Sequence, residues 1–70
     1  MTNIPAPLQL LRLPEVVSRT GLGRSTVWAL IARGQFPKQV KLSARSSAWV
    51  ASEVDQWAAN RITARDQLAA

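Results

Sequence analysis

Two short helical patterns separated by a glycine turn constrain the fold of this 70-residue chain more than any other feature. The first, over 14–19, opens on Pro14, whose missing N–H is tolerated in the first turn of a helix, and it ends at Gly21. The second, over 24–33, repeats apolar residues at i, i+3 and i+4 and ends at Gly34. This spacing predicts a helix-turn-helix.

A change of period after the second helix predicts a small β-hairpin. Polar and apolar residues alternate over 38–42, a polar turn follows at 43–47, and apolar residues return at 48–50. Ser52 has the residue type of a helix N-cap, so a last helix is expected over 53–65. These elements predict a mainly α fold with a small β-hairpin, which is the arrangement of a winged helix-turn-helix.

The order of these elements predicts one domain. We expect the winged helix-turn-helix to occupy residues 10–66. Residues 1–9 carry two prolines and no periodic pattern, so we expect a flexible N-terminal tail there, and we expect residues 67–70 to fray. No apolar run approaches the ~18–20 residues of a membrane span.

Apolar stripes and tryptophans predict the core. The residues expected to face inward are Val27, Leu30 and Ile31 in the second helix and Val54, Trp57, Ala58 and Ile62 in the last one. Trp49 is expected to face Trp57 across the core. The pattern leaves two roles open for Trp28, because this residue could pack under the hairpin or donate its indole N–H to a phosphate.

The residue types that the chain lacks narrow its chemistry. It has no cysteine and no histidine, which excludes a disulfide framework, a zinc site and a thiol nucleophile. With only four carboxylates, most general acid–base schemes also lack their parts. We therefore expect no catalytic activity, no cofactor, no metal and no small-molecule ligand. We also expect a bacterial cytoplasmic location in association with the nucleoid, and no membrane partner.

Positive charge is concentrated in one part of the chain. The formal net charge is +5, and residues 12–45 hold seven basic side chains against one acid. Residues 46–70 hold two basic side chains against three acids. A concentrated positive field in a small domain favours a nucleic-acid partner, whereas a generic solubility charge would be spread evenly.

The second helix and the hairpin tip are the predicted DNA contacts. With the apolar stripe inward, the opposite face of this helix carries short side chains and no acid, which suits a major groove, although an ordinary solvated face is the alternative. The first residues of the helix also place backbone N–H groups where they can meet a phosphate. The predicted DNA-binding residues are Arg24, Ser25, Thr26, Trp28, Ala29 and Arg33 in the helix and Lys38, Lys41, Ser43, Arg45 and Ser46 in the hairpin.

The sequence resembles the AlpA family of prophage-encoded regulators, which is grouped with winged-helix DNA binders such as MerR-type domains and phage excisionases. The resemblance covers residues 10–61. Its most specific parts are TGLGRSTVW, LIARGQFP followed by VKL, and the run from Trp49 through SEV to Trp57. It implies a recognition helix at 24–33 and a wing at 41–47. The contact positions that it implies in this helix are Ser25, Thr26 and Trp28.

The resemblance implies a sequence-specific double-stranded DNA-binding protein that regulates transcription in a prophage or mobile element. The second helix would enter the major groove, and the basic wing would hold the flanking backbone or minor groove. An excisionase that bends attachment-site DNA for an integrase would use the same contacts and is the alternative. An alternative of another class is a small protein-interaction module with only non-specific DNA affinity. Besides duplex DNA, the candidate partners are an integrase and further copies of the chain on DNA.

Overall fold

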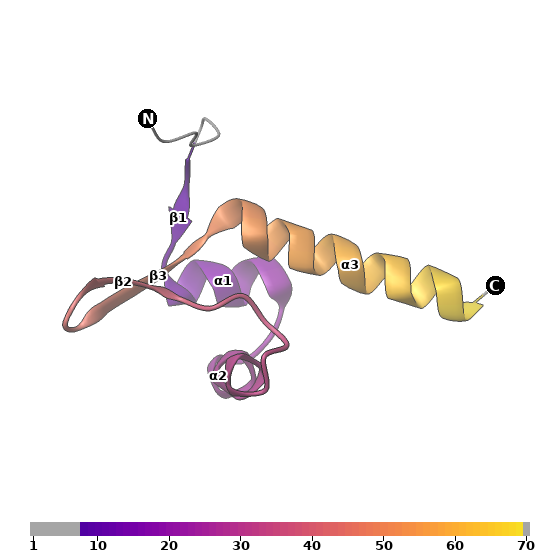
Figure 1. The fold of residues 1–70 in the computed structure, drawn as a ribbon, viewed down its shortest axis with the longest axis horizontal. Helices are drawn as coiled ribbons and strands as arrows, with labels where there is room; N and C mark the ends of the chain where they lie inside the picture. The colour runs from indigo at the N-terminus through magenta and orange to yellow at the C-terminus, as the bar shows by residue number, and fades with distance from the viewer. Residues whose placement is uncertain (1–7, 70) are drawn as a thin grey trace.

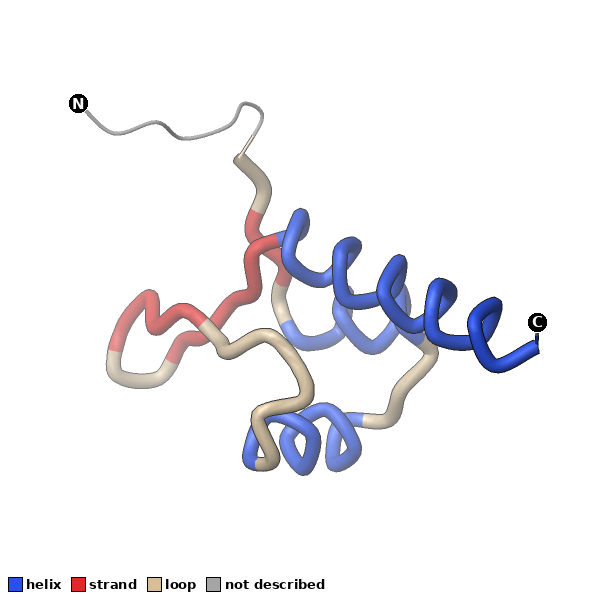
Figure 2. Tube along the Cα trace, turned by 45° about the vertical axis from the view of Figure 1, so that its right-hand side comes forward, coloured by secondary structure: helices blue, strands red, loops and turns tan. Residues whose placement is uncertain are grey.

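The fold is a small three-helix domain with a three-stranded sheet, seen in a computed structural model that describes residues 8–69 (Figure 1). The elements in chain order are β1 (Leu10–Leu11), α1 (Leu13–Thr20), α2 (Arg24–Ala32), β2 (Val40–Ser43), β3 (Ser46–Val50) and α3 (Ala51–Ala69). In Figures 1 and 2 the β2–β3 hairpin and the C-terminal end of α3 lie at opposite ends of the molecule. The mainly α fold with a hairpin wing is confirmed.

Gly21 and Thr20 build the turn between α1 and α2. Gly21 has a left-handed φ of 75°, and its N–H donates to the Val17 carbonyl at 2.8 Å. The Thr20 hydroxyl donates to the Val16 carbonyl at 2.8 Å and accepts from the Leu22 N–H at 3.2 Å. These bonds hold the end of α1 and the start of the turn in one geometry, so the predicted glycine turn of a helix-turn-helix is confirmed.

Replacing Gly21 with alanine is expected to lower the free energy of unfolding by about 1–2 kcal/mol, because a side chain is disfavoured in the left-handed region. No atom lies within 4 Å of the position that a Cβ would occupy, so the cost is conformational and not steric. Asparagine adopts this region more readily, and Gly21→Asn should therefore lose less. Urea denaturation followed by circular dichroism measures both; equal stability of all three proteins would contradict the left-handed turn.

The sheet has a third strand that the sequence pattern did not predict. Its order is β1-β3-β2, and all pairs are antiparallel. Leu10 pairs with Val50 and Leu11 pairs with Trp49. Leu11 is fully buried, so this two-residue strand contributes a core side chain as well as backbone pairing. The predicted two-stranded hairpin is thus present, and β1 adds a third strand to it.

The hairpin itself is shorter than predicted on its first strand. β2 begins at Val40 instead of residue 38, and its pairing with β3 is irregular between Lys41 and Ser43. Val40 and Leu42 are 39% and 48% exposed. Because β2 lies at one edge of the sheet, its alternating polar and apolar residues bury little apolar surface.

The core forms where the sheet meets the helices. Its buried members are Leu11, Val16, Val27, Phe36, Trp49, Ala51 and Val54. The rings of Trp49 and Trp57 do not pair with each other as expected. Trp49 packs on Trp28 with ring centroids 5.5 Å apart, and Trp57 packs edge-to-face on Phe36 at 4.9 Å. The aromatic partner of Trp57 is therefore Phe36, in the loop after α2, and not Trp49 as expected.

The last helix begins earlier and ends later than predicted. Ser52 is not an N-cap, because β3 leads directly into α3 at Ala51 and Ser52 lies inside the first turn. The helix continues to Ala69 instead of ending near residue 65. Val54 is buried, but Ile62 is 53% exposed, so the predicted inward stripe does not extend that far. The second half of α3 projects beyond the rest of the domain (Figure 1).

The predicted chain ends fall partly outside the described residues. Residues 1–7 of the expected tail and Ala70 of the expected fraying segment lie there. Gln9 belongs to the described part, and its carbonyl accepts a hydrogen bond from the Ala51 N–H at 2.9 Å. Between residues 8 and 69, no helix combines the length and the apolar character that crossing a membrane requires.

Candidate nucleic-acid interface

The face of α2 opposite the core is exposed along its whole length. Val27 is fully buried, and Leu30 and Ile31 are half-buried, which confirms the predicted inward stripe. All six predicted contact residues on or next to this helix are exposed: Arg24, Ser25, Thr26, Trp28, Ala29 and Arg33. No acidic side chain belongs to α2, so the exposed face combines short side chains with positive charge at both ends.

The N-terminus of α2 has free hydrogen-bonding capacity. Gly23 is its N-cap and has an extended backbone, so no side chain caps the helix. The Val27 N–H donates to the Gly23 carbonyl at 3.0 Å, but the backbone N–H groups of the preceding turn have no intrahelical acceptor. Together with the positive end of the helix dipole and the Arg24 side chain, these groups favour an anion.

The wing tip is held by its own side chains. Lys41 donates an ammonium proton to the Ala44 carbonyl at 3.2 Å, and the Arg45 N–H donates to the Ser43 hydroxyl at 3.4 Å. The hydroxyl of Ser43 therefore helps to shape the turn, whereas Lys41 keeps further donors for a ligand. Ser46 is half-buried, and Arg45 is exposed at the tip.

A hollow lies where the wing meets the starts of α1 and α2, and we call it the arginine hollow. It has a volume of about 470 Å³ and contains three arginines and no carboxylate. It is lined by Arg12, Leu13, Pro14, Arg24, Trp28, Arg45, Ser47 and Trp49. The structure thus brings together three of the predicted contact residues, Arg24, Trp28 and Arg45, from the helix and the wing.

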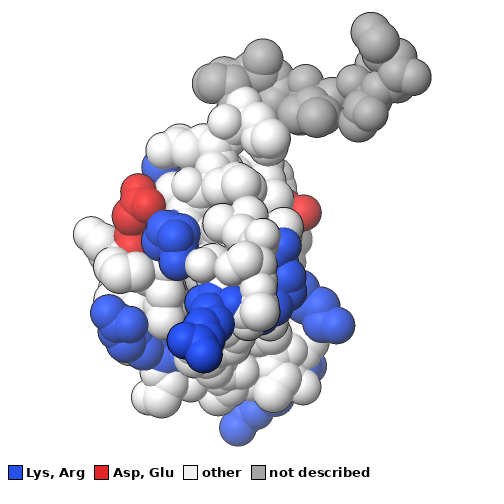
Figure 3. All heavy atoms as spheres, turned by 90° about the vertical axis from the view of Figure 1, so that its left-hand side faces the viewer, with Lys and Arg blue, Asp and Glu red and all other residues white. Residues whose placement is uncertain are grey.

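Acidic side chains are concentrated on α3, where basic residues pair with some of them. Arg19 contacts both carboxylate oxygens of Asp55, at 3.0 and 3.2 Å, and Arg65 contacts Asp66 at 2.8 Å. Exposed pairs of this kind contribute little to stability, but they neutralise charge locally. Figure 3 shows Lys and Arg side chains spread over the lower part of the end of the molecule that carries the wing, with acidic groups only near the upper margins. On this face of the molecule, positive side chains therefore outnumber acidic ones.

A family model described as "Prophage CP4-57 regulatory protein (AlpA)" matches residues 9–62, which is most of the chain. This chain belongs to the AlpA family. The match includes α1, α2, the wing and the first half of α3. All eleven predicted contact residues therefore lie within the part of the chain that is shared with the AlpA family.

Two relatives are similar to this AlpA-family chain. A protein of Enterobacteria phage P4, described as "Uncharacterized protein ORF88", is 49% identical over 57 residues, which cover 81% of this chain and 65% of the phage protein. This chain thus spans about 65% of the length of that relative. The Escherichia coli "DNA-binding transcriptional activator AlpA" is 31% identical over 65 residues, which cover 84% of this chain and 93% of that protein.

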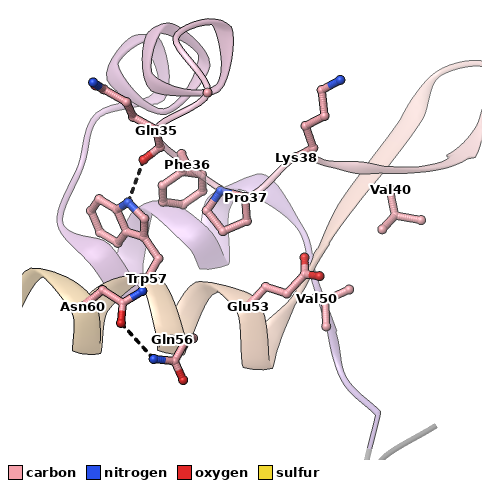
Figure 4. A pocket seen from close by; sticks show the side chains of 11 residues that line it. Gln35, Phe36, Pro37, Lys38, Val40, Val50, Glu53, Gln56, Trp57 and Asn60 are labelled. Atoms are coloured by element: carbon pink, nitrogen blue, oxygen red, sulfur yellow. Dashed lines mark hydrogen bonds between the residues drawn. The ribbon is translucent and has the colours of Figure 1, made fainter. Parts of the chain in front are cut away.

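Lys38 of this AlpA-family chain does not line the arginine hollow, and neither does Arg33. Lys38 precedes the wing and lines a second hollow, of about 680 Å³, between the loop after α2 and the first turns of α3 (Figure 4). Its side chain points away from Glu53 and toward the side on which α2 lies. The second hollow has one basic and one acidic residue, so its charges do not favour an anion.

Two hydrogen bonds fix the loop that borders the second hollow. The Trp57 indole N–H donates to the Gln35 carbonyl at 2.8 Å, and the Trp49 indole N–H donates to the Pro37 carbonyl at 3.1 Å. This loop connects α2 to the wing, and both bonds anchor it to buried or half-buried rings. The position of the wing relative to α2 is therefore supported from within the core.

Arg12 is the charged residue of the arginine hollow that the sequence interpretation missed, whereas Ser47 belongs to the wing predicted at 41–47. Arg12 was counted in the basic segment, but it precedes α1 and belongs to neither predicted contact element. Ser47 lies on β3 opposite Lys41. No local motif indicates Arg12, because it reaches the hollow only through the pairing of β1 with β3 and the packing of α1.

Proposed function

We propose that this AlpA-family chain is a regulator of a prophage or related mobile element that binds specific sites on double-stranded DNA. The observation that carries this proposal is the exposed, acid-free face of α2 beside the arginine hollow and the basic wing. A relative that is named a DNA-binding transcriptional activator and is 31% identical supports it.

In the proposed complex, α2 enters the major groove with its first turn leading. Ser25 and Thr26 reach base edges through their hydroxyl groups, and Ala29 allows close approach and offers a methyl group to a thymine methyl. Arg33, at the end of the helix, reaches a base edge or the adjacent phosphate. The wing, through Arg45 and Lys41, holds the flanking backbone or the minor groove.

Selection of genomic DNA fragments with the purified chain, followed by footprinting at two salt concentrations, tests this proposal. We expect enrichment of a small set of fragments, with log K falling by about 0.9 per phosphate contact for each unit of log salt concentration. A footprint in a promoter fits a transcriptional regulator, whereas a footprint beside an integrase attachment site fits an excisionase. Failure to enrich any fragment would contradict specific DNA binding.

Arg45→Ala is expected to weaken binding alike on all sequences and to make the salt slope shallower by about 0.9, because Arg45 contacts the backbone. Arg33→Ala is the matched variant on α2, and we expect it to change the preference among sequences. Affinities for the selected duplex and for a scrambled duplex measure both effects. Equal losses for both variants on every sequence would contradict readout by α2.

A further inference from the structure

We propose that the arginine hollow is the binding site for one backbone phosphate of the DNA and that Arg12 is a contact residue in it. This inference rests on the proposed function, because it assigns one contact of the same complex. It goes further by adding a residue that lies before α1, outside the helix-turn-helix and outside the wing. The phosphate would be held jointly by three elements and not by α2 or the wing alone.

The charge of the hollow fits a phosphodiester. Its three arginines face no carboxylate among the lining residues. Within residues 8–69, no hydrogen bond or ion pair engages the guanidinium groups of Arg12, Arg24 or Arg45, in contrast to those of Arg19 and Arg65. Arginine binds phosphate oxygens with two parallel N–H groups, which gives both strength and orientation.

Neutral donors and apolar walls complete the hollow. Trp28 is 40% exposed, and its indole N–H has no acceptor in the described part of the chain, whereas those of Trp49 and Trp57 both have one. Ser47 adds a hydroxyl group. Leu13 and the Trp49 ring supply apolar surface, which strengthens charge-assisted hydrogen bonds by reducing the water around them. The two roles left open for Trp28 are compatible, since its ring packs on Trp49 while its N–H stays free.

Backbone structure fixes the positions of two of the three arginines, Arg12 and Arg24. The Arg12 carbonyl accepts from the N–H groups of Glu15 and Val16 at 2.9 and 3.0 Å, and the Arg12 N–H donates to the Glu15 carboxylate at 3.2 Å. Arg12 is thereby the N-cap of α1, and Arg24 is the first residue of α2. The positive ends of two helix dipoles therefore border the same hollow as the three guanidinium groups.

A phosphate bound here would connect the wing to α2. Phosphate contacts fix the register and orientation of a protein on the duplex without reading sequence. Arg45 approaches from the wing, Arg24 from α2 and Arg12 from the N-cap of α1. Occupation of the hollow would therefore set the position of α2 in the groove relative to one backbone strand.

Arg12→Gln tests this assignment, with Arg61→Gln as the matched control. Both substitutions remove one exposed positive charge, but Arg61 lies on α3 outside the arginine hollow. Arg12→Gln should make the salt slope shallower by about 0.9. Its loss of affinity relative to the original chain should therefore be about eightfold larger at about 0.1 M salt than at about 1 M. Arg61→Gln should leave the slope of the chain unchanged, and circular dichroism should show that both variants are folded.

Replacing duplex phosphates one at a time with neutral methylphosphonates identifies the partner of Arg12. We expect one position that weakens binding of the original chain but no longer weakens binding of Arg12→Gln. If no such position exists, or if both variants show the same slope, the phosphate site is wrong. Titration of the original chain with selected and scrambled duplexes separates the phosphate site from the proposed function. Equal affinity for both duplexes would contradict specific DNA binding, but the salt slope of Arg12→Gln would still test the phosphate site.

Discussion

Replacing Trp49 with alanine is expected to destabilise the domain by about 3–5 kcal/mol, the range observed when a large buried aromatic ring is removed. Trp49 is 1% exposed, pairs with Leu11 in the sheet, packs on Trp28 and bonds to the Pro37 carbonyl. Small domains have little stability to lose, since typical values are about 5–15 kcal/mol. A substantial part of the population should therefore be unfolded at physiological temperature.

Urea denaturation followed by circular dichroism measures this effect, with Trp28→Ala as the matched control. The Trp28 ring packs on the same partner, but it is 40% exposed and its N–H is free of bonds within the described residues. We expect this control to lose clearly less stability than Trp49→Ala. Equal losses for the two variants would contradict the assignment of Trp49 as the centre of the core.

Ala29→Glu is expected to reduce affinity for the selected DNA at least about a hundredfold without unfolding the chain. Ala29 is exposed on α2, so a longer side chain meets no core atom, and glutamate is a good helix former. In the proposed complex, however, the carboxylate would lie in the major groove between two phosphate backbones. Like charges brought together at an interface cost several kcal/mol, and each 1.4 kcal/mol is about tenfold in affinity.

Ala59→Glu provides the control for this variant, because Ala59 is also an exposed helical alanine but lies on α3. The two variants have the same composition and net charge. Affinity for the selected duplex should change little in Ala59→Glu, apart from a small long-range effect that salt screens. Equal losses in both variants would indicate that only the net charge matters and that α2 does not enter the groove.

Much of the helix-turn-helix could be predicted because its signals are local. Gly21 ends α1 since its φ of 75° suits glycine, and the apolar spacing in 24–33 identifies the buried face of α2. The exposed residues of α2 could be predicted from the same apolar spacing, because they lie on the opposite face of the helix. The contact role of those residues with DNA stays a prediction.

The features that could not be predicted depend on contacts between distant segments. β1 has two residues, and only its pairing with β3 makes it a strand. Phe36 lies in a loop without periodicity, yet it is 6% exposed and packs on Trp57. The helical spacing of Ile62 matched an inward stripe, but α3 is longer than the body that covers it. The arginine hollow likewise exists only where three elements meet.

The central claim is that α2 and the wing form the DNA-binding face. The most direct test is to map amide chemical shifts by NMR while the isotope-labelled chain is titrated with its selected duplex. The structure predicts the largest changes in α2, in the wing and around Arg12, with small changes over residues 56–66 of α3. The largest changes in α3 and in the loop that borders the second hollow, with α2 unaffected, would contradict the claim.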